Sequence, residues 1–173
     1  MCPWREPESD LKLFFPDATR YSLETRILSG QRLELAERLG RSPTGDENSL
    51  QMYRICGAEY SIGEVLTRRV KGGYGAIELV LAVGTDGKIK GLRLQRLREP
   101  ESVAAALQSP EWLQAFAGRS ADSDWRPHQS LPKTLAEASP SAEAVIEGVR
   151  SLLILLAVAD KNSQAPTTSP RHH

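Results

Sequence analysis

The feature that most constrains the fold is a pair of apolar segments separated by a short turn. Apolar side chains recur at every second position of residues 77–83, which places them on one face of an extended strand. Residues 89–97 form a second segment of this kind, and Asp86-Gly87 lies between the two. Asp-Gly is a favoured dipeptide in the tight turns that join antiparallel strands. Residues 77–97 are therefore predicted to form a β-hairpin, so part of the chain folds as an antiparallel sheet.

The segments on either side of this hairpin show helical spacing. Residues 21–39 carry apolar side chains at roughly helical intervals, with Gly30 as an interruption and Gly40 as a stop signal, so one helix or two short ones are predicted. Further helices are predicted over residues 101–107, 110–116 and 141–159, the last of them capped by Ser141. Together these patterns predict an α+β fold, a single domain whose helices pack on an antiparallel sheet.

The chain of 173 residues is long enough for one domain. Residues 1–20 contain three prolines and are predicted to form an irregular N-terminal lead-in. The α+β domain is predicted over residues 21–160. Residues 161–173 are rich in Pro, Ser and Thr and are predicted to form a disordered tail.

Composition argues against several classes of function. Lys plus Arg and Asp plus Glu both total 22, and aromatic residues make up 6%, so neither a basic surface nor a base-stacking platform for nucleic acid is predicted. Two cysteines and three histidines offer no disulfide scaffold and no zinc-ligand spacing. No apolar run is long enough for a membrane-spanning helix. We expect membrane association only through a missing leader, an anchor or a partner.

A series of short motifs in residues 70–150 resembles the FMN-binding domain family. The motifs are KGGYG at 71–75, the hairpin AVGTDGKIKGLRL at 82–94, Glu99, WLQAFAG at 112–118 and AVIEGVR at 144–150. This domain is found in the flavin-carrying subunits of the Rnf and Na+-translocating NADH:quinone oxidoreductase complexes. The resemblance implies an electron-transfer protein with FMN as cofactor and redox proteins as partners.

Carried over by position, the resemblance implies a cofactor site made of Gly72, Gly73, Tyr74, Gly75, Glu99, Ser139 and Ser141. The family attaches FMN to the threonine of an S-G-A-T motif, which aligns here with Ala136-Glu137-Ala138-Ser139. Ser139 retains a hydroxyl, but Glu137 places a negative charge where a phosphate would approach. We therefore expect any bound flavin to be non-covalent. No metal site and no catalytic residue are predicted.

The family resemblance also implies an extracytoplasmic location, with a leader or anchor upstream of Met1. Cys2 would then be either a lipidated N-terminal cysteine or an ordinary residue of a loose N-terminus. The alternative to electron transfer is a relative that has lost flavin and serves as an accessory, interaction or small-ligand-binding module.

Several of the residues singled out also have purely structural interpretations. The glycines suit a turn, Tyr74 suits a half-buried sheet position, and Glu99 suits the surface. The basic segment 68–71 is expected to be a solvated cluster at a strand end or a phosphate or acidic-partner site. Four other residues are expected to pack in the interior: Trp112, Phe116, Trp125 and Cys56.

Overall fold

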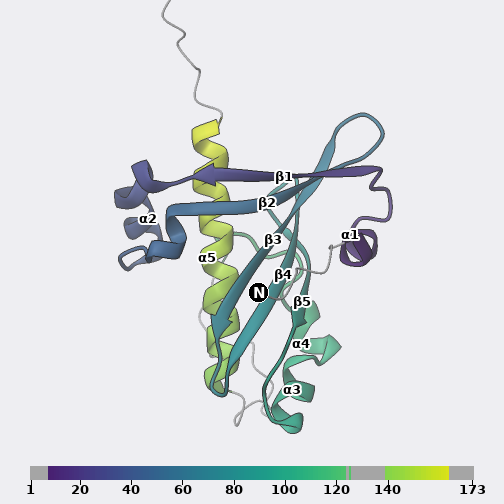
Figure 1. Cartoon of the computed structure of the whole chain (residues 1–173), viewed down its shortest axis with the longest axis vertical. Helices are drawn as coiled ribbons and strands as arrows, with labels where there is room; N and C mark the ends of the chain where they lie inside the picture. Colours follow the sequence, from purple (N-terminus) through teal and green to yellow (C-terminus); the bar gives the residue numbers. More distant parts are fainter. Residues whose placement is uncertain (1–7, 124, 126–138, 164–173) are drawn as a thin grey trace, which may run out of the picture.

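The protein is built around a five-stranded antiparallel sheet whose strands follow the order of the sequence, β1-β2-β3-β4-β5 (Figure 1). The structure is a computed structural model that describes residues 8–123, 125 and 139–163. The strands are β1 (Arg20–Ile27), β2 (Ser49–Cys56), β3 (Ser61–Lys71), β4 (Ala76–Gly84) and β5 (Ile89–Gln95). Each strand pairs with its neighbours in sequence, which makes the sheet a simple meander.

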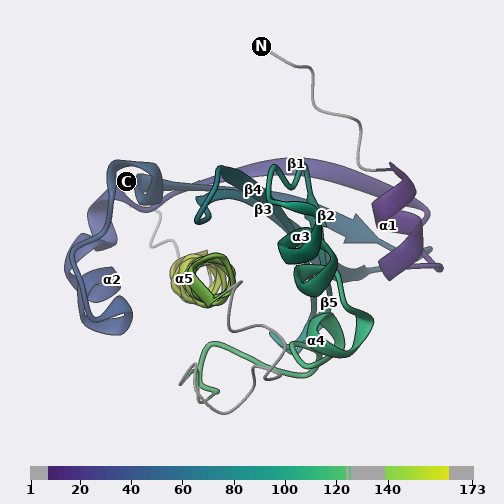
Figure 2. The ribbon, with the colours of Figure 1, turned by 90° about the horizontal axis from the view of Figure 1, so that it is seen from below.

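Helices cover both faces of this sheet. They are α1 (Glu8–Phe14), α2 (Arg32–Leu39), α3 (Glu101–Leu107), α4 (Pro110–Gln114) and the long α5 (Ser139–Ser163), with short 3-10 turns η1 (Ser29–Gln31) and η2 (Gly45–Asn48). Figure 2 looks along α5 and shows the sheet curving around it, with α2 on one side and α3 and α4 on the other. None of the described helices has the length and apolar character needed to cross a membrane.

The main core lies between α5 and the sheet. Leu66, Leu79 and Leu81 point from the central strands toward buried α5 residues that include Val149 and Leu152. Burial of this apolar surface is the main free-energy gain of such a fold. A smaller core on the opposite face packs Leu11 of α1, and Phe15 just after this helix, against residues of β2, β3 and β4.

The predicted α+β architecture and its hairpin are confirmed. β4 and β5 pair antiparallel, with Leu81 opposite Leu92 and Leu79 opposite Leu94. Gly87 in the turn has φ of 77°, a conformation that glycine adopts at low cost. The helices predicted after the hairpin are present as α3, α4 and α5, and Trp112 and Phe116 are buried and pack edge to face.

Two local predictions are wrong. Residues 20–27 form β1 instead of a helix, because they pair along their whole length with β2. The lead-in predicted to be irregular contains α1, which packs on the sheet through Leu11. α5 extends to Ser163, and the rest of the predicted tail lies outside the described residues.

We expect Gly148→Ala to destabilise the contact between α5 and the sheet. A Cβ at Gly148 would lie 2.6 Å from Cγ1 of Val70 and 2.7 Å from Cδ1 of Leu79, so the helix must move away from the strands. Overpacking of this kind costs about 1–3 kcal/mol, although alanine is the better helix former. Urea unfolding of the variant and of Gly45→Ala, where a Cβ meets no atom within 4 Å, measures the difference. Equal stabilities would contradict the packing described here.

Candidate functional site

Residues that are far apart in the sequence meet at the turn between β3 and β4. The N–H of Gly72 donates to the carbonyl of Gly75 at 2.8 Å and closes this turn. The N–H of Gly73 donates to Oγ of Ser141 at 2.9 Å. Ser141 is buried in the first turn of α5, so its hydroxyl bonds to the glycine turn instead of capping the helix as predicted. Figure 1 shows the β3–β4 turn beside the N-terminal end of α5.

The Glu99 carboxylate lies against the same turn. A Cβ added to Gly72 would collide with Oε1 of Glu99 and would lie 3.1 Å from Oγ of Ser141, so only glycine allows the carboxylate to approach so closely. Both carboxylate oxygens of Glu99 are buried and have no hydrogen-bond partner within the described part of the chain. Buried carboxylate oxygens without hydrogen-bond donors lower the stability of a protein, and buried polar atoms are nearly always hydrogen-bonded. The environment of Glu99 therefore needs an explanation.

We refer to Gly72, Gly73, Glu99 and Ser141 as the glycine-turn cluster. These four of the seven candidate residues come into contact with one another. The side chain of Tyr74 is 63% exposed, so the expectation of a half-buried ring is wrong.

The remaining candidates are less informative. Gly75 lies beside Arg98, since a Cβ there would be 3.4 Å from the Arg98 Cβ. Ser139 is the first residue of α5, but its side chain lies outside the described part of the structure, as do residues 136–138 and Cys2.

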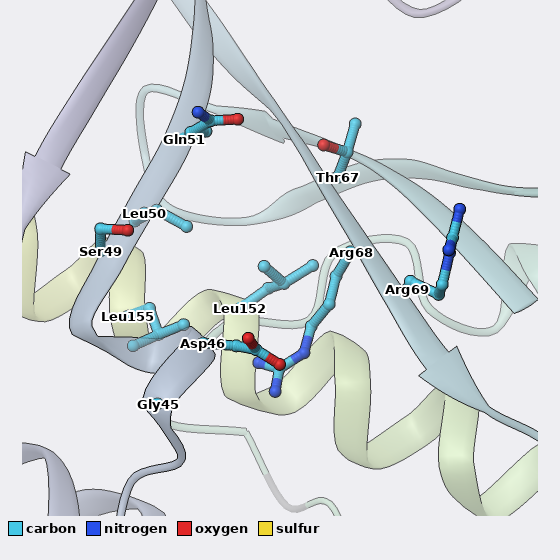
Figure 3. A pocket seen from close by; sticks show the side chains of 10 residues that line it. All are labelled: Gly45, Asp46, Ser49, Leu50, Gln51, Thr67, Arg68, Arg69, Leu152 and Leu155. Carbon is cyan, nitrogen blue, oxygen red and sulfur yellow. The ribbon is translucent and has the colours of Figure 1, made fainter. Parts of the chain in front are cut away.

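A cavity of about 470 Å³ lies elsewhere, between β2 and β3. Pairing of these strands ends at Met52 opposite Leu66, and beyond this pair the strands diverge. Leu152 and Leu155 of α5 line the gap, and Arg68 reaches from β3 toward Asp46 of η2 (Figure 3). A neighbouring cavity of about 340 Å³ shares Arg68 and Arg69 and extends over Glu78. Neither of these two cavities includes a residue of the glycine-turn cluster.

Arg68, which lines the first cavity, also belongs to an ion cluster around a buried carboxylate. Glu47 is fully buried and accepts hydrogen bonds from both terminal nitrogens of Arg41, at 2.6 and 3.1 Å, and from Arg68 at 3.2 Å. The N–H of Thr44 donates to the same carboxylate at 2.9 Å. Burial by itself would raise the pKa of Glu47, but these donors and the positive charge of Arg68 lower it to about 2.

Arg68 extends this cluster to α5. It donates to Oγ of Ser151 at 2.8 Å, and Ser151 in turn donates to the carbonyl of Gly148. On the other face of the sheet, Arg69 pairs with Glu78 at 2.8 Å. Both arginines of the basic segment are therefore engaged by carboxylates of the chain itself, and the interpretation of a solvated cluster is wrong for Arg68. Sequence reasoning missed Glu47, although a capping-box pattern, Thr44 followed by Glu47, was present.

A second group of charges lies near the C-terminal end of α5. Burial raises the pKa of Glu64 to about 7, and the nearby charge of Asp160 adds to this shift, while Arg54 opposes it. Burial also raises the pKa of Asp160. Among the described residues, no group of three or more His, Cys, Asp or Glu side chains is arranged to hold a metal ion.

Comparison of the chain with models of known protein families gives no match, and comparison with curated proteins gives no significant match. The glycine-turn cluster and the cavity between β2 and β3 are therefore interpreted from their own chemistry.

We expect Glu47→Gln to reduce stability by about 1–3 kcal/mol at neutral pH, because it removes the buried carboxylate to which the partly exposed Arg41 and Arg68 donate. The pKa of Glu47 is lowered from 4.5 to about 2 on folding, so its contribution is full above pH 4.5 and is lost as the pH falls toward 2. Urea unfolding at pH 7 and at pH 3 measures this. The exposed neighbour Asp46→Asn is the matched control, and a variant as stable as this control at pH 7 would contradict the prediction.

Ionisation of Glu64 should lower the stability of the protein, whereas ionisation of Glu47 raises it. Its pKa is raised from 4.5 to about 7, so ionisation is disfavoured in the folded state, and stability falls as the pH rises from about 4.5 to 7. Glu64→Gln should remove this fall and be more stable than the parent chain by about 1–2 kcal/mol at pH 8, with little difference at pH 4.5. Thermal unfolding across this range, with exposed Glu59→Gln as control, tests the sign. Parallel pH profiles for parent and variant would refute it.

Proposed function

We propose that this protein binds FMN non-covalently at the glycine-turn cluster and transfers electrons between redox proteins. The observation that carries the proposal is the contact of Gly72, Glu99 and Ser141, which the sequence resemblance selected independently of their arrangement. Residues chosen from three separate segments would not be expected to meet at one point by chance. The extracytoplasmic location implied by the resemblance belongs to the same proposal.

The chemistry of the cluster suits a ligand that carries both hydroxyl groups and a phosphate. The buried Glu99 oxygens are strong acceptors without donors among the described residues, and the hydroxyls of a ribityl chain are donors of the required kind. The N-terminal end of α5 lies beside the cluster, and the positive end of a helix dipole suits a phosphate. Because Glu99 is negative, a phosphate is expected on the α5 side of the cluster, away from the carboxylate.

In this proposal the side chains of Glu99 and Ser141 bind and orient the ligand. Glu99 orients the ligand by accepting its hydroxyl protons, and Ser141, which already accepts from Gly73, still has a hydroxyl proton to donate. When bound, FMN supplies the electron-transfer chemistry, and the protein supplies binding and orientation.

A second candidate function rests on a different observation. The N–H groups of Gly72 and Gly73 are already satisfied within the protein, and the two cavities described above lie at the β2–β3 gap. This arrangement favours the alternative of a family relative that has lost flavin and acts as an accessory or small-ligand-binding module. In that case the close packing of Glu99 on Gly72 is structural.

Glu99→Gln separates the two functions. If the cluster binds FMN, the variant should bind at least about tenfold more weakly, because a neutral amide is a poorer acceptor for hydroxyl donors than a carboxylate. The same variant should raise the melting temperature of the ligand-free protein, since it removes buried charged oxygens without partners. Fluorescence quenching of added FMN and thermal unfolding measure the two effects.

Glu101→Gln, two residues further along at the exposed start of α3, is the matched control. A parent protein that is colourless and does not quench FMN fluorescence would overturn the flavin proposal. If such a parent protein is still stabilised by Glu99→Gln, the accessory function is the better supported of the two. Unchanged FMN affinity in Glu99→Gln would show that any flavin binds elsewhere.

A further inference from the structure

We propose that two copies of this chain associate through the open edge of β1, so that the sheet continues from one copy into the next. β1 is the first strand of the sheet, and β2 is the only described element with which it makes extensive contact. Figure 1 shows no described helix along its outer edge. A strand edge of this length presents a row of backbone donors and acceptors to any strand that can pair with it.

The backbone groups available at this edge follow from the pairing of β1 with β2. The N–H of Leu28 donates to the carbonyl of Asn48 at 2.7 Å, in line with the register of the two strands. In an antiparallel pair, hydrogen-bonded positions alternate along each strand. The N–H and C=O groups of Leu23, Thr25 and Ile27 therefore point away from β2, toward the open edge.

One register makes this edge complementary to itself. With Thr25 of both copies on a twofold axis, antiparallel pairing sets Leu23 opposite the partner's Ile27 and Glu24 opposite the partner's Arg26. The axis repeats both pairs on its other side, as a twofold interface requires. Moving the twofold axis by one residue, to Glu24, places Glu24 opposite the partner's Glu24 and removes both the Glu24–Arg26 and the Leu23–Ile27 pairs across the interface. Charge complementarity thus selects a second copy in this register as the occupant.

Two apolar side chains of β1 are exposed in the single chain, and pairing with a second copy would bury part of their surface. Leu23 is 56% and Ile27 is 68% exposed, and both lie on the same face of β1. Apolar pairs that face each other across two strands stabilise a sheet by roughly 0.2–1 kcal/mol each. Glu24 and Arg26 lie on the other face, where they pair with each other at 3.1 Å and Glu24 also pairs with Arg54 at 3.3 Å. About a third of each side chain stays accessible, at 30% and 32%, so each can also meet its counterpart in a second copy.

The twofold axis is perpendicular to the sheet, so both copies of α5 lie on the same face of the joined sheet. α5 crosses behind β1, and its last turn extends past the open edge (Figure 1). The two helices would therefore run antiparallel near the axis, which adds a second layer to the interface.

Thr25→Pro tests the backbone part of the proposal. Proline removes the N–H on the axis, and this N–H points away from β2, so the fold is retained. Thr25→Val, which keeps the N–H, is the matched control. Sedimentation velocity across a concentration series should show dimers for the parent and for Thr25→Val, and a dissociation constant at least about tenfold higher for Thr25→Pro.

A charge exchange tests the register. Arg26→Glu places two negative charges opposite each other at both ends of the interface and should yield monomers. Adding Glu24→Arg to the same chain restores opposite charges across the axis and should restore dimers. Circular dichroism verifies that every variant is folded.

A parent chain that stays monomeric at all concentrations would overturn the proposal. Dimers that persist in both Thr25→Pro and Arg26→Glu would also overturn it, because association would then use another surface. Failure of the charge exchange to restore dimers, when Thr25→Pro does weaken the dimer, would refute the Thr25-centred register.

Discussion

The arrangement of this fold depends on one buried carboxylate, that of Glu47. It accepts hydrogen bonds from Arg41, which follows α2, and from Arg68 in the middle of β3, while Arg68 also bonds to Ser151 of α5. Arg150 of α5 donates to the last carbonyls of α2, which completes the connection between the two helices. A charge without water must be matched by donors that are held in place, so this one group determines the positions of α2, η2, β3 and α5 relative to one another.

The parts of the fold that could be predicted from sequence are those whose signals are local. The β4–β5 hairpin follows from alternating apolar residues around Asp86-Gly87, and α3 and α5 follow from helical spacing. β1 was missed because Leu23 and Ile27 are four residues apart, a spacing that fits a helix as well as a strand. The choice between them is made by pairing with β2, which lies more than twenty residues away and leaves no local signal.

The same division holds for the candidate sites. Gly72, Glu99 and Ser141 could be selected by resemblance, but their contact depends on where α5 begins relative to the β3–β4 turn. The cavity between β2 and β3 could not be predicted, because it exists only where two paired strands separate. Glu47 was missed, because only the folded chain brings Arg41 and Arg68 together at it.

The short pairing of β2 with β3 has a mechanical consequence. These strands pair only from Met52 to Cys56, so the sheet consists of two ribbons, β1–β2 and β3–β4–β5, that share a narrow joint. A narrow joint resists rotation poorly, and the angle between the ribbons is therefore set by α5 and the Glu47 ion cluster, which span the gap. α5 and the Glu47 ion cluster thus hold the two ribbons at one angle, which the short β2–β3 pairing alone would leave open.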